Sequence, residues 1–330
     1  MTSADTRIAR APCRVLVLCG PTGVGKTEVA VALARRHKFE IVSADSRQVY
    51  SGLDIGTAKP GVELRREIGI HMVDVVEPNR AYSAVDFARD ALTVMRQLRD
   101  KGKRFAVVGG SGMYLKALFE PFFEAPKPSP ALRQRLETET SPALYDRLKR
   151  VDPERAAKLH PNDRQRVVRA LEVYETTGKT MTELARKAKA EVEFEPVYVV
   201  LSMERELLRR RIDARFDAMM SAGLLDEVRR LKKSGFGRDS YVASAYGYAE
   251  LLGHLEGQLT INRAVAEAKA KTRAYAKRQM TWFRSLKDAK WLECEDVADG
   301  VREVEPLLRE VLTDSRTKDE RQSTKDKARA

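Results

Sequence analysis

The sequence predicts an α/β protein: a P-loop NTPase-like parallel sheet covered by helices, with an inserted all-helical domain. Two observations predict the sheet. Short apolar runs alternate with helix-like segments over residues 14–120, and several of these runs end in glycine or aspartate. A third observation predicts the insertion, because residues 131–190 show only helical patterns, whereas an apolar strand-like run returns at residues 196–201.

The elements follow in order along the chain. The first predicted strand, residues 14–19, leads into a glycine-rich loop and then a helix from Glu28 to His37. A later helix begins at Ser83, where Asp86 completes a capping box, and closes near Gly102. Further strands are predicted over residues 40–44, 70–76 and 104–108. The carboxyl ends of these strands present residues 20–27, Asp45, Asp74 and residues 109–112, which we expect to share one crevice.

Composition shifts set the predicted domain boundaries. The segment PFFEAPKPSP at residues 121–130 is rich in proline and is typical of a linker. We predict a catalytic core over residues 1–120 and 196–313, a helical insertion over 121–195, and a disordered tail over 314–330, where apolar side chains are almost absent.

Overall composition excludes several classes of protein. The 330 residues are 43% apolar, which is too high for a disordered chain. No stretch approaches the roughly 18 uninterrupted apolar residues that cross a bilayer, and the N-terminus lacks a signal-peptide pattern, so we expect a cytoplasmic protein without a membrane span. The three cysteines and four histidines are scattered, so a metal would be a hard, oxygen-bound ion.

The net charge of +13 is concentrated near the C-terminus. Residues 263–290 contain nine Lys or Arg against two acidic residues, together with Tyr275, Trp282 and Phe283. This pattern fits two structures, a helix with a solvated basic face over a buried aromatic face, or a surface that binds nucleic acid.

The glycine-rich loop is a complete P-loop, in which Gly20 and Gly25 bracket four residues and Lys26-Thr27 follow. Its backbone N–H groups and the helix N-terminus attract phosphate, Lys26 neutralises phosphate oxygens, and the Thr27 hydroxyl suits Mg²⁺. The residues predicted to hold phosphate are Gly20, Pro21, Thr22, Gly23, Val24, Gly25, Lys26 and Thr27.

Two further features are ambiguous when taken alone. Asp45 lies at a strand end, where it could hold Mg²⁺, act as a base or cap the following turn. The arginines at positions 209, 210, 211 and 215 form either a solvated helix face or a clamp for diphosphate.

Taken together, the motifs resemble the bacterial form of the tRNA dimethylallyltransferase family. The similarity lies in residues 20–27, 43–60, 81–87, 107–118, 160–180, 211–228 and 277–284. It implies transfer of a dimethylallyl group from dimethylallyl diphosphate to the N6 amine of the adenine immediately 3′ of the anticodon, with Mg²⁺ as cofactor. The implied partner is the anticodon stem-loop of tRNA, and we expect a monomer.

The resemblance also implies roles for individual residues. Asp45 would be the general base, assisted by Lys26, Ser111 and Arg211, and Arg215 would join the diphosphate site. The implied tRNA contacts are Asp45, Ser46, Arg47, Gln48, Ser111, Arg133, Gln165, Arg166, Val167, Val168 and Arg169. Ser111 stands where the family usually has Thr, which keeps the hydroxyl, and residues 244–249 lack basic side chains, so contact by that loop is open.

Two alternatives remain at this stage. One is a P-loop kinase or ATPase acting on a nucleotide or RNA, with Asp45 or Asp74 as the Mg²⁺-holding acid. The other is a non-catalytic RNA-binding protein, which would explain the basic segment and leave the P-loop without a task.

Overall fold

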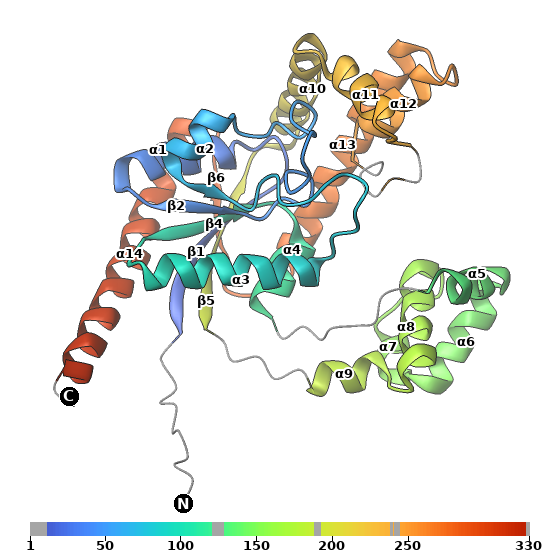
Figure 1. The fold of residues 1–330 in the computed structure, drawn as a ribbon, viewed down its shortest axis with the longest axis horizontal. Coiled ribbons are helices and arrows are strands. Elements are labelled where there is room, and N and C mark those ends of the chain that lie inside the picture. The colour runs from blue at the N-terminus through green and yellow to red at the C-terminus, as the bar shows by residue number, and fades with distance from the viewer. Residues whose placement is uncertain (1–11, 121–128, 188–192, 238–239, 241–244, 328–330) are drawn as a thin grey trace, which may run out of the picture. The chain divides into compact units, whose positions relative to one another are not determined.

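The computed structural model describes residues 12–120, 129–187, 193–237, 240 and 245–327. Within them, six strands form one parallel sheet in the order β3-β2-β4-β1-β5-β6 (Figure 1). The strands are β1 (Cys13–Cys19), β2 (Glu40–Ser43), β3 (Ile70–His71), β4 (Phe105–Gly109), β5 (Phe194–Ser202) and β6 (Lys290–Glu293). The predicted P-loop-like parallel sheet is therefore confirmed.

Strand β1 lies near the centre of the sheet, with Val17 paired to Val107 of β4 on one side and to Tyr198 of β5 on the other. Its side chains alternate between two apolar clusters, one containing Val17 and the other Leu16 and Leu18. Both faces are thus covered, which is why the strands are nearly continuous apolar runs.

Helices cover both faces of the sheet. Residues of α3 and α4 pack in one cluster, and residues of α1 and α14 pack in the other. Figure 1 shows α3 crossing in front of the strands. The helices of this part are α1 (Lys26–His37), α2 (Val62–Ile68), α3 (Ala84–Asp100), α4 (Gly112–Phe119), α10 (Arg205–Ser221), α11 (Leu224–Lys233), α12 (Tyr248–Leu255), α13 (Ile261–Phe283) and α14 (Val297–Lys327).

Local signals predicted some elements better than others. The capping box of α3 is confirmed, with the Ser83 hydroxyl accepting the Asp86 N–H at 3.1 Å and the Ser83 N–H donating to the Asp86 carboxylate at 3.0 Å. The strand predicted over 70–76 is shorter, because Met72 and Asp74 adopt φ of 62° and 55°, outside the extended region. Strand β6 was not predicted, since it has only four residues and forms a mostly exposed edge of the sheet.

A separate helical unit spans Glu120–Glu191, and the remaining chain, Met1–Phe119 with Val192–Ala330, forms the unit that contains the sheet. Leu144, Leu148 and Leu171 are fully buried in the helical unit, which gives it a core of its own. Its helices are α5 (Pro130–Thr138), α6 (Ser141–Val151), α7 (Pro153–Ala157), α8 (Arg164–Thr177) and α9 (Met181–Lys187). The predicted role of this unit in holding tRNA stays a prediction.

Helix α14 extends further than the sequence predicted. It runs to Lys327, whereas a disordered tail was predicted over residues 314–330. The segment contains neither glycine nor proline, and the helix is already anchored by buried Val304, Leu308 and Val311, so it propagates into the polar sequence.

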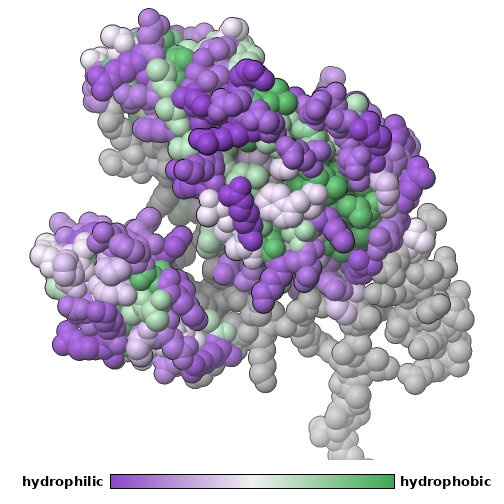
Figure 2. All heavy atoms as spheres, turned by 180° about the vertical axis from the view of Figure 1, so that it is seen from behind, coloured by the Kyte–Doolittle hydropathy of each residue, from purple (hydrophilic) through white to green (hydrophobic). Residues whose placement is uncertain are grey.

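The surface is mostly polar. Seen from the side opposite to Figure 1, hydrophilic side chains cover most of the protein and hydrophobic ones gather in smaller patches on the sheet-containing unit (Figure 2). Among the described residues, the exposed large hydrophobic side chains are Val62, Val75, Met113 and Trp291. No helix in the described part of the chain combines the length and apolar character needed to cross a membrane.

Candidate active site

The P-loop follows β1 directly, and its backbone conformation requires glycine. Gly23 has φ of 85°, and a Cβ added there would lie 2.9 Å from Cγ1 of Ile212 on α10. Gly25 has φ of 99° and immediately precedes the first turn of α1. The loop is therefore a tight turn that directs the N-terminus of α1 toward the carboxyl ends of the strands, as anion binding requires.

Lys26 folds back over this loop. Its Nζ donates to the Pro21 carbonyl at 3.3 Å. Burial lowers the pKa of Lys26, and the charge of nearby Asp45 acts in the opposite direction while Arg215 adds to the lowering. A buried cation beside another cation favours an anionic ligand, because the ligand would supply the missing counter-charge.

Two of the five arginines on α10, Arg211 and Arg215, face the P-loop or the adjoining cavity. The Nε of Arg211 donates to the Gly23 carbonyl at 3.1 Å. Arg215 lines the adjoining cavity, and burial lowers its pKa. Arg209 and Arg210 are exposed, and Arg209 pairs with Glu206 at 3.1 Å. One side of α10 is therefore a solvated basic face, and the other side places Arg211 and Arg215 near the phosphate-binding loop.

Asp45 lies two residues beyond β2, on the same rim as the P-loop. Its Oδ1 accepts the N–H groups of Arg47 at 2.8 Å and of Gln48 at 3.3 Å, so it does cap the turn. Capping engages Oδ1 and fixes the carboxylate in orientation, which is compatible with a role as base. The adjacent Ser46 N–H donates to the Ser111 hydroxyl at 2.9 Å, which joins the loop after β2 to the loop after β4.

A buried carboxylate, which the sequence did not predict, shapes a further wall of the site. Glu227 of α11 is 2% exposed and accepts three backbone N–H groups from residues 54–56 at 2.8 to 3.2 Å. It also accepts the Tyr248 hydroxyl at 2.6 Å. This holds the loop so that the Thr57 carbonyl accepts the Gln48 side-chain amide at 3.1 Å.

Helix α13 contributes two more residues: Gln279, which sequence reasoning missed, and Tyr275, which it named only as part of the basic, aromatic segment 263–290. The Gln279 side chain accepts the Thr22 N–H at 2.9 Å and donates to the Gly110 carbonyl at 2.8 Å, so it bridges the P-loop and the glycine loop after β4. Tyr275 lies one turn earlier and also lines the cavity, and burial together with the Asp45 charge raises its pKa to about 12. Gln279 belongs to the motif at residues 277–284, which was the available signal.

Tyr275 forms an aromatic pair with Tyr246, and Arg278 lies against this pair. The rings of Tyr246 and Tyr275 have centroids 5.0 Å apart, and the Arg278 side chain donates to the Tyr246 hydroxyl at 2.6 Å. Arg278 also lies 5.9 Å from the Tyr246 ring centroid. An aromatic pair with a cation is the kind of surface on which a nucleobase stacks.

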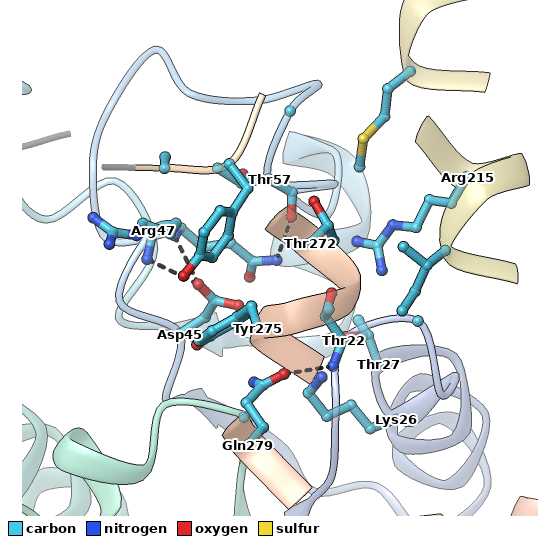
Figure 3. A pocket seen from close by; sticks show the side chains of 18 of the residues that line it. Thr22, Lys26, Thr27, Asp45, Arg47, Thr57, Arg215, Thr272, Tyr275 and Gln279 are labelled. Carbon is cyan, nitrogen blue, oxygen red and sulfur yellow. Dashed lines mark hydrogen bonds between the residues drawn. The ribbon is translucent and has the colours of Figure 1, made fainter. Parts of the chain in front are cut away.

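These elements enclose one cavity of about 110 Å³, shown in Figure 3. Figure 3 shows Lys26, Thr27, Asp45 and Arg215 around it, contributed by the P-loop helix, the loop after β2 and α10. Of the residues predicted for the site, those lining the cavity are Thr22, Gly23, Lys26, Thr27, Asp45, Arg47, Gln48 and Arg215. Tyr246, Thr272, Tyr275 and Gln279 also line it.

The remaining predicted tRNA contacts lie in the helical unit. Val167 and Val168 are 1% and 3% exposed in its core, so their side chains do not face solvent, and contact of this stretch of α8 with tRNA stays a prediction. Gln165 and Arg166 are exposed. Arg133 and Arg169 both pair with buried Glu172, at 3.0 and 3.3 Å.

Asp74 is a structural residue rather than a second candidate acid. Its carboxylate pairs with Lys59 at 2.5 Å and with Arg65 at 2.6 Å, and these cations hold its pKa below the usual range against the effect of burial. It does not line the cavity. The pairing anchors the loop that Glu227 also holds.

The donor set near the P-loop bears on the metal. No group of three or more His, Cys, Asp or Glu side chains able to hold a metal occurs among the described residues. The Thr27 hydroxyl is an oxygen donor that lines the cavity. This set fits an ion such as Mg²⁺, which takes most of its ligands from substrate phosphates and water.

Comparisons with known proteins agree with this arrangement. The sequence matches the family described as IPP transferase over residues 48–286. It is 43% identical to tRNA dimethylallyltransferase 1 of Citrifermentans bemidjiense over 85% of this chain and 92% of that protein.

Two solved structures are also similar. One is the full-length tRNA isopentenylpyrophosphate transferase of Bacillus halodurans, with a TM-score of 0.68, 34% identity and coverage of 92% of this chain and 98% of that one. The other is a eukaryotic dimethylallyltransferase acting on tRNA, with a TM-score of 0.74, 30% identity and coverage of 87% of this chain and 75% of that one. Since the family match spans most of the chain and includes α10, α13 and the loop after β2 from Gln48 onward, this protein belongs to the IPP transferase family.

Proposed function

We propose that this protein transfers a dimethylallyl group from dimethylallyl diphosphate to the exocyclic N6 amine of the adenine immediately 3′ of the anticodon in tRNA, in the cytoplasm. The observation that carries the proposal is that Lys26 of the P-loop, Arg215 of α10 and Asp45 line the same cavity. A diphosphate leaving group and a nucleophile that must lose a proton can therefore meet there. The names of the relatives support this substrate pair.

The electrophile needs activation because the adenine amine is a weak nucleophile, its lone pair being delocalised into the ring. The P-loop N–H groups, Lys26 and Arg215 would stabilise the departing diphosphate as the bond between C1 and oxygen breaks. Arg211, through its bond to the Gly23 carbonyl, would hold the loop in shape. Mg²⁺ bound with the diphosphate and Thr27 would neutralise further negative charge.

The proton would be removed by Asp45, which lines the same cavity as Lys26 and Arg215. As the N6–C1 bond forms, the amine proton becomes strongly acidic, and the Asp45 carboxylate would accept it. The Ser111 hydroxyl supports the Asp45 loop through Ser46. The products are prenylated tRNA, diphosphate and a proton, so the reaction balances without a redox partner.

The tRNA would contact the protein near Ser46, Arg47 and Gln48, and through exposed residues of the helical unit. Gln165 and Arg166 are exposed on α8, and Arg133 and Arg169 are held in place by Glu172. Because phosphate contacts dominate RNA affinity, binding should weaken steeply as salt is raised. Salt-independent binding would contradict this part of the proposal.

The direct test supplies unmodified tRNA, labelled dimethylallyl diphosphate and Mg²⁺ without ATP. Label is expected in RNA, and at the adenine 3′ of the anticodon when the product is digested to nucleosides. A stem-loop with guanine at that position is the matched control and should remain unlabelled. ATP hydrolysis without transfer of label would instead favour the P-loop ATPase alternative.

A further inference from the structure

One face of α10 forms the apolar side of the cavity. Ile212, Arg215, Phe216 and Met219 follow the i, i+3, i+4, i+7 spacing that places them on one helix face, and all four line the cavity. Arg215 supplies a cation on this face, and the other three are apolar. Figure 3 shows Arg215 reaching into the cavity from α10.

Phe216 is held against the start of α12. It is 4% exposed, and a Cβ added at Gly247 would lie 2.9 Å from its Cε2. Gly247 has φ of 96°, so the backbone that passes behind the ring is itself a tight turn. The ring therefore cannot withdraw without moving the N-terminus of α12.

Ile212 is fixed at the other end of the same face. It is 3% exposed, and its Cγ1 would lie 2.9 Å from a Cβ at Gly23. The apolar face thus begins in contact with the phosphate-binding loop and ends at half-buried Met219. Because both the loop and the helix are packed, the distance between the diphosphate site and the Phe216 ring is set by the fold.

We propose that Phe216 and Met219 determine the chain length of the prenyl donor and restrict the enzyme to a five-carbon prenyl diphosphate. The inference rests on the proposed function and deepens it. With the diphosphate at the P-loop and C1 directed toward the amine, the hydrocarbon lies against the α10 face. The second isoprene unit of geranyl diphosphate would overlap the Phe216 ring and the Met219 side chain, so the ten-carbon donor is excluded by contact.

The test compares dimethylallyl and geranyl diphosphate as donors to unmodified tRNA. The reaction is the same for both, with the C1–O bond of the donor breaking, the N6–C1 bond forming and the amine proton leaving to Asp45. Wild-type protein is expected to favour the five-carbon donor by at least about 100-fold in kcat/KM. Phe216→Ala and Met219→Ala are expected to raise the geranyl-to-dimethylallyl ratio by about 10-fold or more, because each removes part of the barrier.

Controls separate this effect from loss of stability. Met220→Ala removes a neighbouring methionine of α10 that does not line the cavity, and it should leave the donor ratio unchanged. Phe216→Leu keeps an apolar side chain and provides a second variant if Phe216→Ala fails to fold. An unchanged ratio in folded Phe216→Leu and Met219→Ala proteins would overturn the proposal, as would a wild-type enzyme that uses both donors equally.

A binding measurement keeps the inference separate from the proposed function. Titration calorimetry compares geranyl diphosphate, dimethylallyl diphosphate and inorganic diphosphate on each protein. The variants should gain affinity for geranyl diphosphate and keep their affinity for inorganic diphosphate, even if no RNA is modified. Absence of transfer with this gain present would contradict the proposed function alone. Transfer with no gain in either assay would contradict the chain-length role alone.

Discussion

Gln279 accepts the backbone N–H of Thr22 at 2.9 Å, so a residue of α13 holds the tip of a P-loop 257 positions earlier in the chain. The same side chain donates to the Gly110 carbonyl at 2.8 Å. A side chain at position 110 would displace the Gln279 amide group, so this bridge depends on the glycine there. The Gln279 side chain therefore connects the phosphate-binding loop to the loop after β4, which supports Asp45 through Ser111.

Replacing Gln279 tests this link. Gln279→Ala leaves the Thr22 N–H and the Gly110 carbonyl without their partner, so we expect a loss of about 1–3 kcal/mol in unfolding free energy. Displacement of the two loops should lower kcat/KM by about 10- to 100-fold. Denaturant unfolding and steady-state transfer assays measure the two effects. Gln97→Ala on the exposed face of α3 is the control, and equal behaviour of the two variants would contradict the link.

Asp45→Asn tests the general base without disturbing the turn. Asparagine keeps a side-chain oxygen that can accept the Arg47 and Gln48 N–H groups, so folding and tRNA affinity should change little. Transfer should fall by about 10²- to 10⁴-fold, since the amide cannot take up the amine proton. Single-turnover kinetics measure the loss, and tRNA binding by filter retention is the control. Activity within a few fold of wild type would show that another group removes the proton.

Lys26→Met tests whether Lys26 contributes to diphosphate binding and not to folding stability. Burial lowers the pKa of Lys26, which means that the folded protein without ligand disfavours its charged form. The variant should therefore melt about 2 °C higher than wild type and bind inorganic diphosphate about 10-fold more weakly. Thermal scanning and calorimetry provide the measurements, with Lys101→Met at an exposed site as control. Unaltered diphosphate affinity would refute the role.

Glu227→Ala should be among the more damaging substitutions outside the cavity. It leaves three backbone N–H groups and the Tyr248 hydroxyl without an acceptor, for which we expect a loss of at least about 3 kcal/mol. Glu227→Gln should lose less, because it keeps one acceptor oxygen. Urea unfolding measures both, and Asp226→Asn on the exposed side of α11 is the control. A loss no larger than that of the control would show that the loop does not depend on Glu227.

Glu305 predicts a pH dependence of stability. Arg309, His37 and Arg36 hold the pKa of Glu305 at about 2, below its reference value of 4.5. A depressed carboxyl pKa contributes stability that is complete above the reference value and is lost as the pH falls through about 2. Glu305→Gln should therefore lower the melting temperature near neutral pH, and the difference in melting temperature from wild type should vanish toward pH 2. Glu303→Gln should show a smaller difference in melting temperature. A difference between Glu305→Gln and wild type that does not change with pH would argue against the ion pairs of Glu305.

The sequence predicted the parts of the site that are local in the chain. The P-loop spacing, the strand before it and the helix after it occur within residues 13–37, so their geometry follows from neighbouring residues. The capping box of α3 is local in the same way. For such features, the residue pattern and the structure carry the same information.

Long-range contacts could not be predicted in this way. In the sequence, Glu227 is an ordinary acidic residue of an amphipathic helix. Only the fold shows that it accepts hydrogen bonds from the backbone N–H groups of residues 54–56. Val167 and Val168 were assigned to tRNA contact by resemblance, although their apolar side chains at adjacent helix positions pack in the core. Edge strand β6 lacked a signal because its mostly exposed residues need no apolar pattern.

The position of β5 bears on how the chain is made. Strand β1 pairs along its length with β5, and β5 follows the entire helical unit in the sequence. During synthesis on the ribosome, the nascent chain therefore carries β1 with one bare hydrogen-bonding edge until Phe194 and the residues after it have emerged. The helical unit, which has its own core, can fold in that interval, and premature termination within it would release a product prone to aggregate through the open edge of β1.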